Sequence, residues 1–174
     1  MWSQGTARLL ETFKRVTTIF SFGYWGWGTK THQLVSMVDE SESAAGYKPP
    51  LWVDIRLERT GRAPGFVGDA FKEVTGPDRY AWMQELGNEG IHDDPPGLRL
   101  KNPDATGELL KLAMQSSSQE RRILFYCACE QTGGRAAECH RALVATFLLQ
   151  EAMRAGQVIE VVEWPGGNPK HLPC

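Results

Sequence analysis

The chain has 174 residues, of which 41% are hydrophobic, and its formal net charge is −2. This length suits a single domain with a sizeable core, and the slightly acidic balance counts against binding a polyanion over the whole surface. No run approaches the ~18 apolar residues that a membrane span needs, so no membrane partner is expected.

The first half of the chain alternates strand patterns with helix patterns. A polar lead-in covers 1–15, after which β-branched and aromatic residues predict a strand that ends at a glycine-rich turn. The elements expected next, in chain order, are a strand at 16–22, a helix from Thr29 or Thr31 to about 42, a strand at 51–56, a short helix at 68–74 and a short strand at 79–83.

The second half begins with a long polar loop at 85–103 and then repeats the alternation. It predicts a helix at 104–114, a strand at 122–127, a helix at 136–155 ended by Gly156, a strand at 158–163 and an irregular tail at 164–174. Strands that alternate with helices indicate an α/β fold. We therefore expect one domain over 1–174, with a mainly parallel sheet of about five strands flanked by helices.

Reactive side chains concentrate where strands 51–56 and 122–127 end. In parallel sheets, sites form beyond the carboxyl ends of the strands. Cys127, Cys129, Cys139 and His140 follow one strand, and Asp54 and Arg56 end the other. We therefore expect these groups to meet at one rim of the sheet.

Three of the four cysteines lie within thirteen residues, and the amino-terminal stretch lacks an apolar signal segment. This usage favours reduced thiols in the cytoplasm. A helix amino terminus lowers the pKa of a nearby thiol, so Cys129 and Cys139 are candidate nucleophiles, with His140 as an acid or base. Five residues separate Cys129 from Arg135, which is the cysteine-to-arginine spacing of the phosphate-binding loop in cysteine phosphatases.

Two other interpretations of the same residues stay open. Cys127, Cys129, Cys139 and His140 supply four soft ligands, enough for a tetrahedral zinc ion. Neighbouring helical residues point about 100° apart, which counts against Cys139 and His140 sharing one ion, so no metal ligand is assigned and the cofactor is unknown. Alternatively, a cysteine at a buried strand end is an ordinary small apolar residue, which is the favoured interpretation of Cys127.

The fragment "CACEQTGGRAAECHRALVA" resembles the signature of an uncharacterised family known as domain of unknown function 488. "TIFSFGYWGWG", "LWVDIRLERTGRAPGF" and "ELGN" resemble other parts of that family, in the same order, and the likeness runs from Thr17 to Val162. The resemblance implies an α/β sandwich and brings no settled activity. The strand with Val-Asp-Ile-Arg is also similar in architecture to rhodanese-type sulfurtransferases.

Arginines and aromatic residues supply the candidate binding groups. Arg56 and Arg141 are expected at the pocket, as clamps for a phosphate or carboxylate, with Asp54 held beside them. Tyr24, Trp25 and Trp27 lie among glycines after the first strand, where aromatic rings stack on bases or pack into the core. We expect one of the two tryptophans to be buried and the other exposed.

These features support three functions. The first is an enzyme or ligand-binding protein for a small anionic or nucleotide-like ligand, with thiol or histidine chemistry. The second is a nucleic-acid-binding module that uses the aromatic turn and the arginines. The third is a metal-binding protein that uses the cysteines and His140.

Overall fold

A computed structural model of the chain describes residues 16–129 and 139–164. The described residues form a five-stranded parallel sheet with the strand order β3-β2-β4-β1-β5. Its strands are β1 (Thr17–Gly23), β2 (Lys48–Asp54), β3 (Tyr80–Trp82), β4 (Arg121–Cys127) and β5 (Ile159–Glu163). The α/β fold class expected from the alternating pattern is thereby confirmed.

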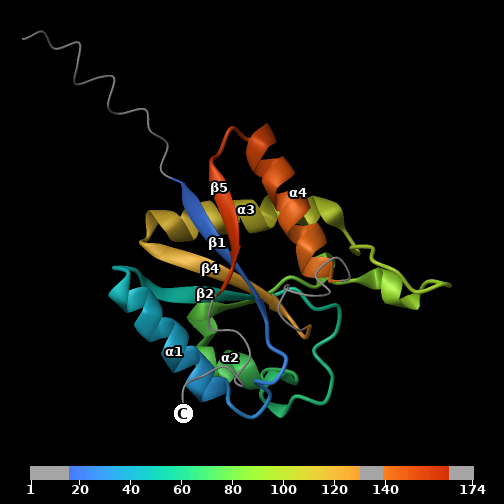
Figure 1. The fold of residues 1–174 in the computed structure, drawn as a ribbon, viewed down its shortest axis with the longest axis horizontal. Coiled ribbons are helices and arrows are strands. Elements are labelled where there is room, and N and C mark those ends of the chain that lie inside the picture. Colours follow the sequence, from blue (N-terminus) through green and yellow to red (C-terminus); the bar gives the residue numbers. More distant parts are fainter. Residues whose placement is uncertain (1–15, 130–138, 165–174) are drawn as a thin grey trace, which may run out of the picture.

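Within the described residues, four α-helices cover the two faces of the sheet. They are α1 (Thr31–Ala44), α2 (Ala70–Thr75), α3 (Thr106–Ser118) and α4 (His140–Arg154). Figure 1 shows α1 and α2 on one side of the sheet and α3 and α4 on the other. None of the helices in the described ranges is both long and apolar enough to cross a membrane.

β4 occupies the centre of the sheet because it is apolar on both faces, as a strand buried between two helical layers must be. Successive side chains of a strand point to opposite faces. Ile123, Phe125 and Cys127 accordingly join a core that α3 and α4 cover, which we call the α3/α4 core. Leu124 and Tyr126 join an aromatic-rich core under α1 and α2, which we call the α1/α2 core.

Several element boundaries differ from those expected, among them those of β2, α3 and α4. The helix expected at 104–114, α3, covers Thr106–Ser118. The strand expected at 51–56 begins at Lys48 and ends at Asp54, with a register shift between Lys48 and Leu51. Pro49 and Pro50 cause that irregularity, because proline has no N–H to give to the neighbouring strand.

The last helix, expected from about 136, begins at His140. Cys139 before it has an extended backbone, with φ −106° and ψ 130°. Gly156, with φ +62°, ends the helix as expected.

Candidate functional site

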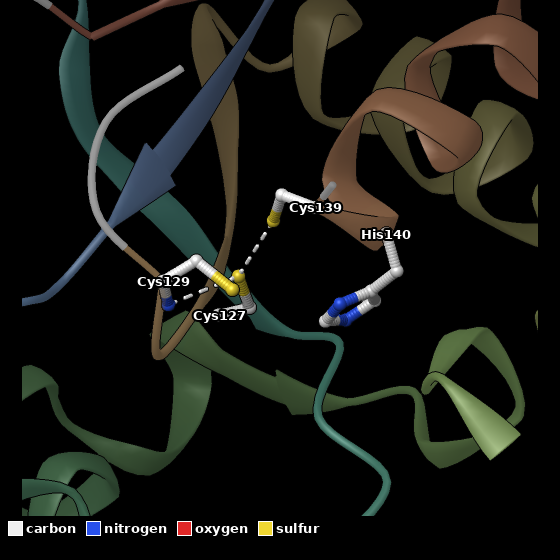
Figure 2. Close-up of side chains that lie close together, drawn as sticks. All are labelled: Cys127, Cys129, Cys139 and His140. Carbon is white, nitrogen blue, oxygen red and sulfur yellow. Dashed lines mark hydrogen bonds between the residues drawn. The ribbon is translucent and has the colours of Figure 1, made fainter. Parts of the chain in front are cut away.

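The carboxyl end of β4 faces the first turn of α4, and four side chains with soft donor atoms converge there (Figure 2). Cys127 is the last residue of β4, Cys129 lies in the bend that follows, and Cys139 and His140 open α4. We call these four residues the Cys/His cluster. Their ligand atoms all lie within 4.8 Å of one another.

Cys139 can reach β4 because it is not helical. As the N-cap residue it keeps an extended backbone, so the angle of about 100° between successive helical side chains does not apply to Cys139 and His140. Its Sγ lies 3.4 Å from the Sγ of Cys127. The argument against Cys139 and His140 sharing one ion is therefore wrong. It assumed that both residues are helical, whereas α4 begins at His140.

His140 has a fixed ring orientation. Its Nε2 lies 3.1 Å from the backbone carbonyl oxygen of Ile55, just beyond the end of β2. A carbonyl only accepts hydrogen bonds, so Nε2 carries the proton and donates it. The lone pair of the neutral ring is then on Nδ1, which leaves that atom available as a ligand or proton acceptor.

The cluster is largely removed from solvent. Cys127 is fully buried, and Cys139 and His140 are 5% and 8% exposed. Cys129 is half-buried and is the most accessible of the three thiols. The cluster is therefore a small, mostly enclosed set of polarisable donors with one partly open side.

The thiols differ in acidity because their surroundings differ. Burial raises the pKa of Cys127 well above its usual value. Hydrogen bonds from Cys127 and Cys129, with a further contribution from the backbone N–H of Arg141, hold the pKa of Cys139 below its usual range. The anionic form of one thiol is thus favoured at the helix amino terminus, as a helix dipole also favours.

Arg141 lies on the same face of the sheet as the cluster and is completely buried. Its Nη1 donates to Oε1 of Glu163 at 2.6 Å and to Oγ of Ser21 at 3.3 Å. Burial alone would lower its pKa, but Cys127 in its thiolate form and the Glu163 carboxylate outweigh burial and raise it. Arg141 is thus an internal cation between β5 and the thiols, already paired with a carboxylate.

Asp54 and Arg56 form a separate group on the α1/α2 side of the sheet. The fully buried Asp54 carboxylate accepts hydrogen bonds from Nε and Nη2 of Arg56, at 2.8 and 2.6 Å. It also accepts from the hydroxyls of Tyr80 and Tyr126, at 3.0 and 3.2 Å. Arg56 donates further to the hydroxyl of Tyr24 at 3.0 Å. We call these five residues the Asp54 network.

From the sequence, we expected all candidate residues to meet at one rim of the sheet. The structure instead places them in two groups, on opposite faces of the sheet. Tyr24 and Tyr126 belong to the α1/α2 core, whereas Cys127 and Cys139 belong to the α3/α4 core. The reason is the alternation of side chains along β4, which sends Tyr126 and Cys127 to opposite faces. The structure brings Arg141 to the Cys/His cluster and places Asp54, Arg56 and Tyr24 in the other group.

Replacing Tyr24 by Phe tests how firmly Arg56 is held. The change leaves one buried guanidinium N–H without its acceptor, and we expect the free energy of unfolding to fall by about 1–2 kcal/mol. Urea unfolding measures this free energy. Trp25→Phe on the same turn is the control: Trp25 is 56% exposed, so we expect no measurable change in the free energy of unfolding. A loss below about 0.5 kcal/mol for Tyr24→Phe would show that Arg56 does not depend on the phenol.

The aromatic turn places its two tryptophans differently. Trp27 is fully buried and Trp25 is 56% exposed, so the expected division between the two tryptophans is confirmed. Tyr24 stacks on Phe66, with ring centroids 3.9 Å apart. Arg135, the arginine of the phosphatase-like spacing, lies in 130–138, outside the residues that the structure describes.

Cys127 lies in the cluster, which agrees with its interpretation as one of four possible zinc ligands rather than with the purely apolar role that was favoured for it. One contact of the site could not be recognised in the sequence. The contact between His140 and the carbonyl of Ile55 joins positions 85 residues apart and has no sequence signature.

Comparisons with known proteins identify no relative. A scan against protein-family models matches no family, and searches of curated proteins and of solved structures find no match. The resemblance to domain of unknown function 488 therefore stays a prediction from the sequence.

Proposed function

We propose that this protein binds one zinc ion through Cys127, Cys129, Cys139 and His140. The observation that carries the proposal is the convergence of three thiols and one imidazole, with all ligand atoms within 4.8 Å of one another. In a tetrahedral site with Zn–S bonds of about 2.3 Å, neighbouring sulfurs lie about 3.8 Å apart. The cluster has nearly this size, so small side-chain movements would complete the coordination.

The donor set favours zinc over harder ions. Three thiolates and one neutral imidazole are typical of closed structural zinc sites, whereas calcium and magnesium select oxygen ligands. The carbonyl of Ile55 accepts the Nε2 proton of His140, which is the usual outer contact that orients a metal-bound histidine. Nδ1 would then be the ligand atom.

The proposed metal has a structural role. Four protein ligands leave no open position for a water molecule or a substrate. Two ligands come from the end of β4 and two from the start of α4, so the ion would tie the central strand to the helix that covers the α3/α4 core. The metal would hold together two elements that the chain connects through 130–138.

The anionic or nucleotide-like ligand expected from the sequence has less support. Arg56 and Arg141 are 6% and 0% exposed, and each is paired with a carboxylate, Asp54 or Glu163. Releasing either arginine would leave a buried charge without its partner, which is costly. Neither guanidinium is therefore free to bind a phosphate in this conformation.

Metal analysis of the purified protein tests the proposal. We expect one zinc ion per chain, and we expect Cys127→Ser, Cys139→Ser and His140→Asn each to weaken zinc binding at least about 100-fold, because even outer contacts are worth 10–100-fold. Cobalt substitution should give thiolate-to-cobalt charge-transfer bands that each Cys→Ser change weakens.

Matched controls separate these effects from general losses. Cys174→Ser removes the one cysteine outside the cluster, and His32→Asn removes an exposed histidine of α1. Both variants should keep one zinc ion per chain. A wild-type protein that, after expression with added zinc, holds no metal and binds none at micromolar concentration contradicts the proposed function.

A further inference from the structure

We propose that hydroperoxides oxidise this site, that a disulfide between Cys127 and Cys139 forms, and that the metal leaves. The inference rests on the proposed zinc site and concerns its regulation. It starts from two observations on the three thiols, which are their unequal access to solvent and the short distance between two of the sulfurs.

Solvent accessibility indicates that Cys129 is the thiol that reacts first. Cys127 is fully buried and Cys139 is 5% exposed, whereas Cys129 is half-buried in the bend after β4. Oxidation of thiols follows thiolate character and exposure. Zinc supplies the thiolate character of all three ligands, so exposure decides among them.

Proximity decides which disulfide remains. The Sγ atoms of Cys127 and Cys139 are 3.4 Å apart, and a disulfide bond of about 2.05 Å requires them to approach by about 1.4 Å. Cys127 and Cys129 are separated by one residue along the chain. A bond between those two would close a very small ring, whereas Cys127 and Cys139 come from different elements that already face each other.

The chemistry balances in three steps. The Cys129 thiolate attacks the peroxide O–O bond, forms a sulfenic acid and releases hydroxide, or alkoxide from an alkyl hydroperoxide. The Cys139 thiolate then attacks the sulfenic sulfur and expels hydroxide, giving a Cys129–Cys139 disulfide. The Cys127 thiolate finally attacks the Cys139 sulfur and releases the Cys129 thiolate. Two thiolates have lost two electrons, and the peroxide has gained them.

Oxidation removes two of the four metal ligands. Only Cys129 and His140 remain, which is too few to retain zinc, so the ion is released. The new disulfide joins the same two elements that the metal joined, the end of β4 and the start of α4. The oxidised protein therefore keeps α4 attached while it has lost its metal, and reduction in the presence of zinc restores the site.

The test treats the zinc-loaded wild-type protein with hydrogen peroxide. We expect one zinc ion released per chain, measured with a chromogenic chelator, together with a mass loss of about 2 Da for the two hydrogens of one disulfide. Peptide mapping should find Cys127 joined to Cys139. Dithiothreitol with added zinc should restore both the metal and the free thiols.

The order of events is tested by trapping sulfenic acid with dimedone at early times. Label on Cys129 supports the proposal, and label first on Cys127 overturns it. Zinc-loaded Cys174→Ser, which lacks the one cysteine outside the cluster, should release zinc and form the disulfide at the wild-type rate.

The outcomes separate this inference from the proposed function. A protein that never holds zinc removes the proposed function, whatever peroxide does to its thiols. A protein that holds zinc but keeps it under excess peroxide, or that forms a Cys127–Cys129 bond, overturns the redox inference and leaves the zinc site standing.

Discussion

Removal of the proposed zinc ion should lower the melting temperature by about 10 °C. When free zinc exceeds its dissociation constant about a thousandfold, binding adds about 4 kcal/mol to the free energy of unfolding. For a chain of 174 residues, each kcal/mol corresponds to about 2–4 °C. The physical reason is that the proposed ion would connect Cys127 of β4 to His140 of α4, whose ligand atoms lie within 4.8 Å of each other, so losing it would loosen the helix over the α3/α4 core.

Differential scanning calorimetry with and without a chelator measures this effect, after metal analysis confirms that the ion has been removed. The Cys127→Ser variant supplies the control, because a zinc affinity lowered about 100-fold leaves only about 1.4 kcal/mol of stabilisation at the same free zinc, so its melting temperature should respond to the chelator much less than that of wild type. Lowering the pH should have the same effect as the chelator, since cysteine ligands must lose their protons to bind. An unchanged melting temperature in protein verified as zinc-free would contradict a structural role for the metal.

Asp54→Asn should lower the free energy of unfolding by about 3–5 kcal/mol, the usual consequence of removing one partner from a buried ion pair. The substitution keeps the size of the side chain but removes the charge that two guanidinium nitrogens of Arg56 contact. An amide nitrogen would also face the donors of Arg56, Tyr80 and Tyr126, which all point at the carboxylate. The Arg56 charge would then remain buried without compensation.

Urea unfolding measures the change, and a shifted midpoint with an unchanged slope would show that stability alone is affected. Asp93→Asn is the matched control, because Asp93 pairs with Arg99 at the surface, where ion pairs contribute little. The zinc content of Asp54→Asn should equal that of wild type, since the Asp54 network lies on the other face of the sheet. A loss below about 1 kcal/mol would mean that Arg56 finds another partner.

Much of the fold follows from local patterns in the sequence. The apolar run of β4, the helical period of α4 and the glycine at 156 define elements that need no distant contact to be recognised. The order β3-β2-β4-β1-β5 depends on pairings between segments far apart in the chain, such as Ile19 with Ile123. No local pattern encodes such pairings, so the sheet order was not predicted.

The sequence by itself determined that three thiols and an imidazole lie near one strand end and one helix start, because adjacency in the chain guarantees it. Only the tertiary structure decided which groups share a site. The alternation along β4 sends Cys127 to the α3/α4 core and Tyr126 to the Asp54 network. The extended backbone of Cys139 turns its thiol towards Cys127. Both outcomes depend on the exact residue at which β4 ends and α4 begins. A shift of one residue would send a strand side chain to the opposite face of the sheet, and would make Cys139 part of the helix.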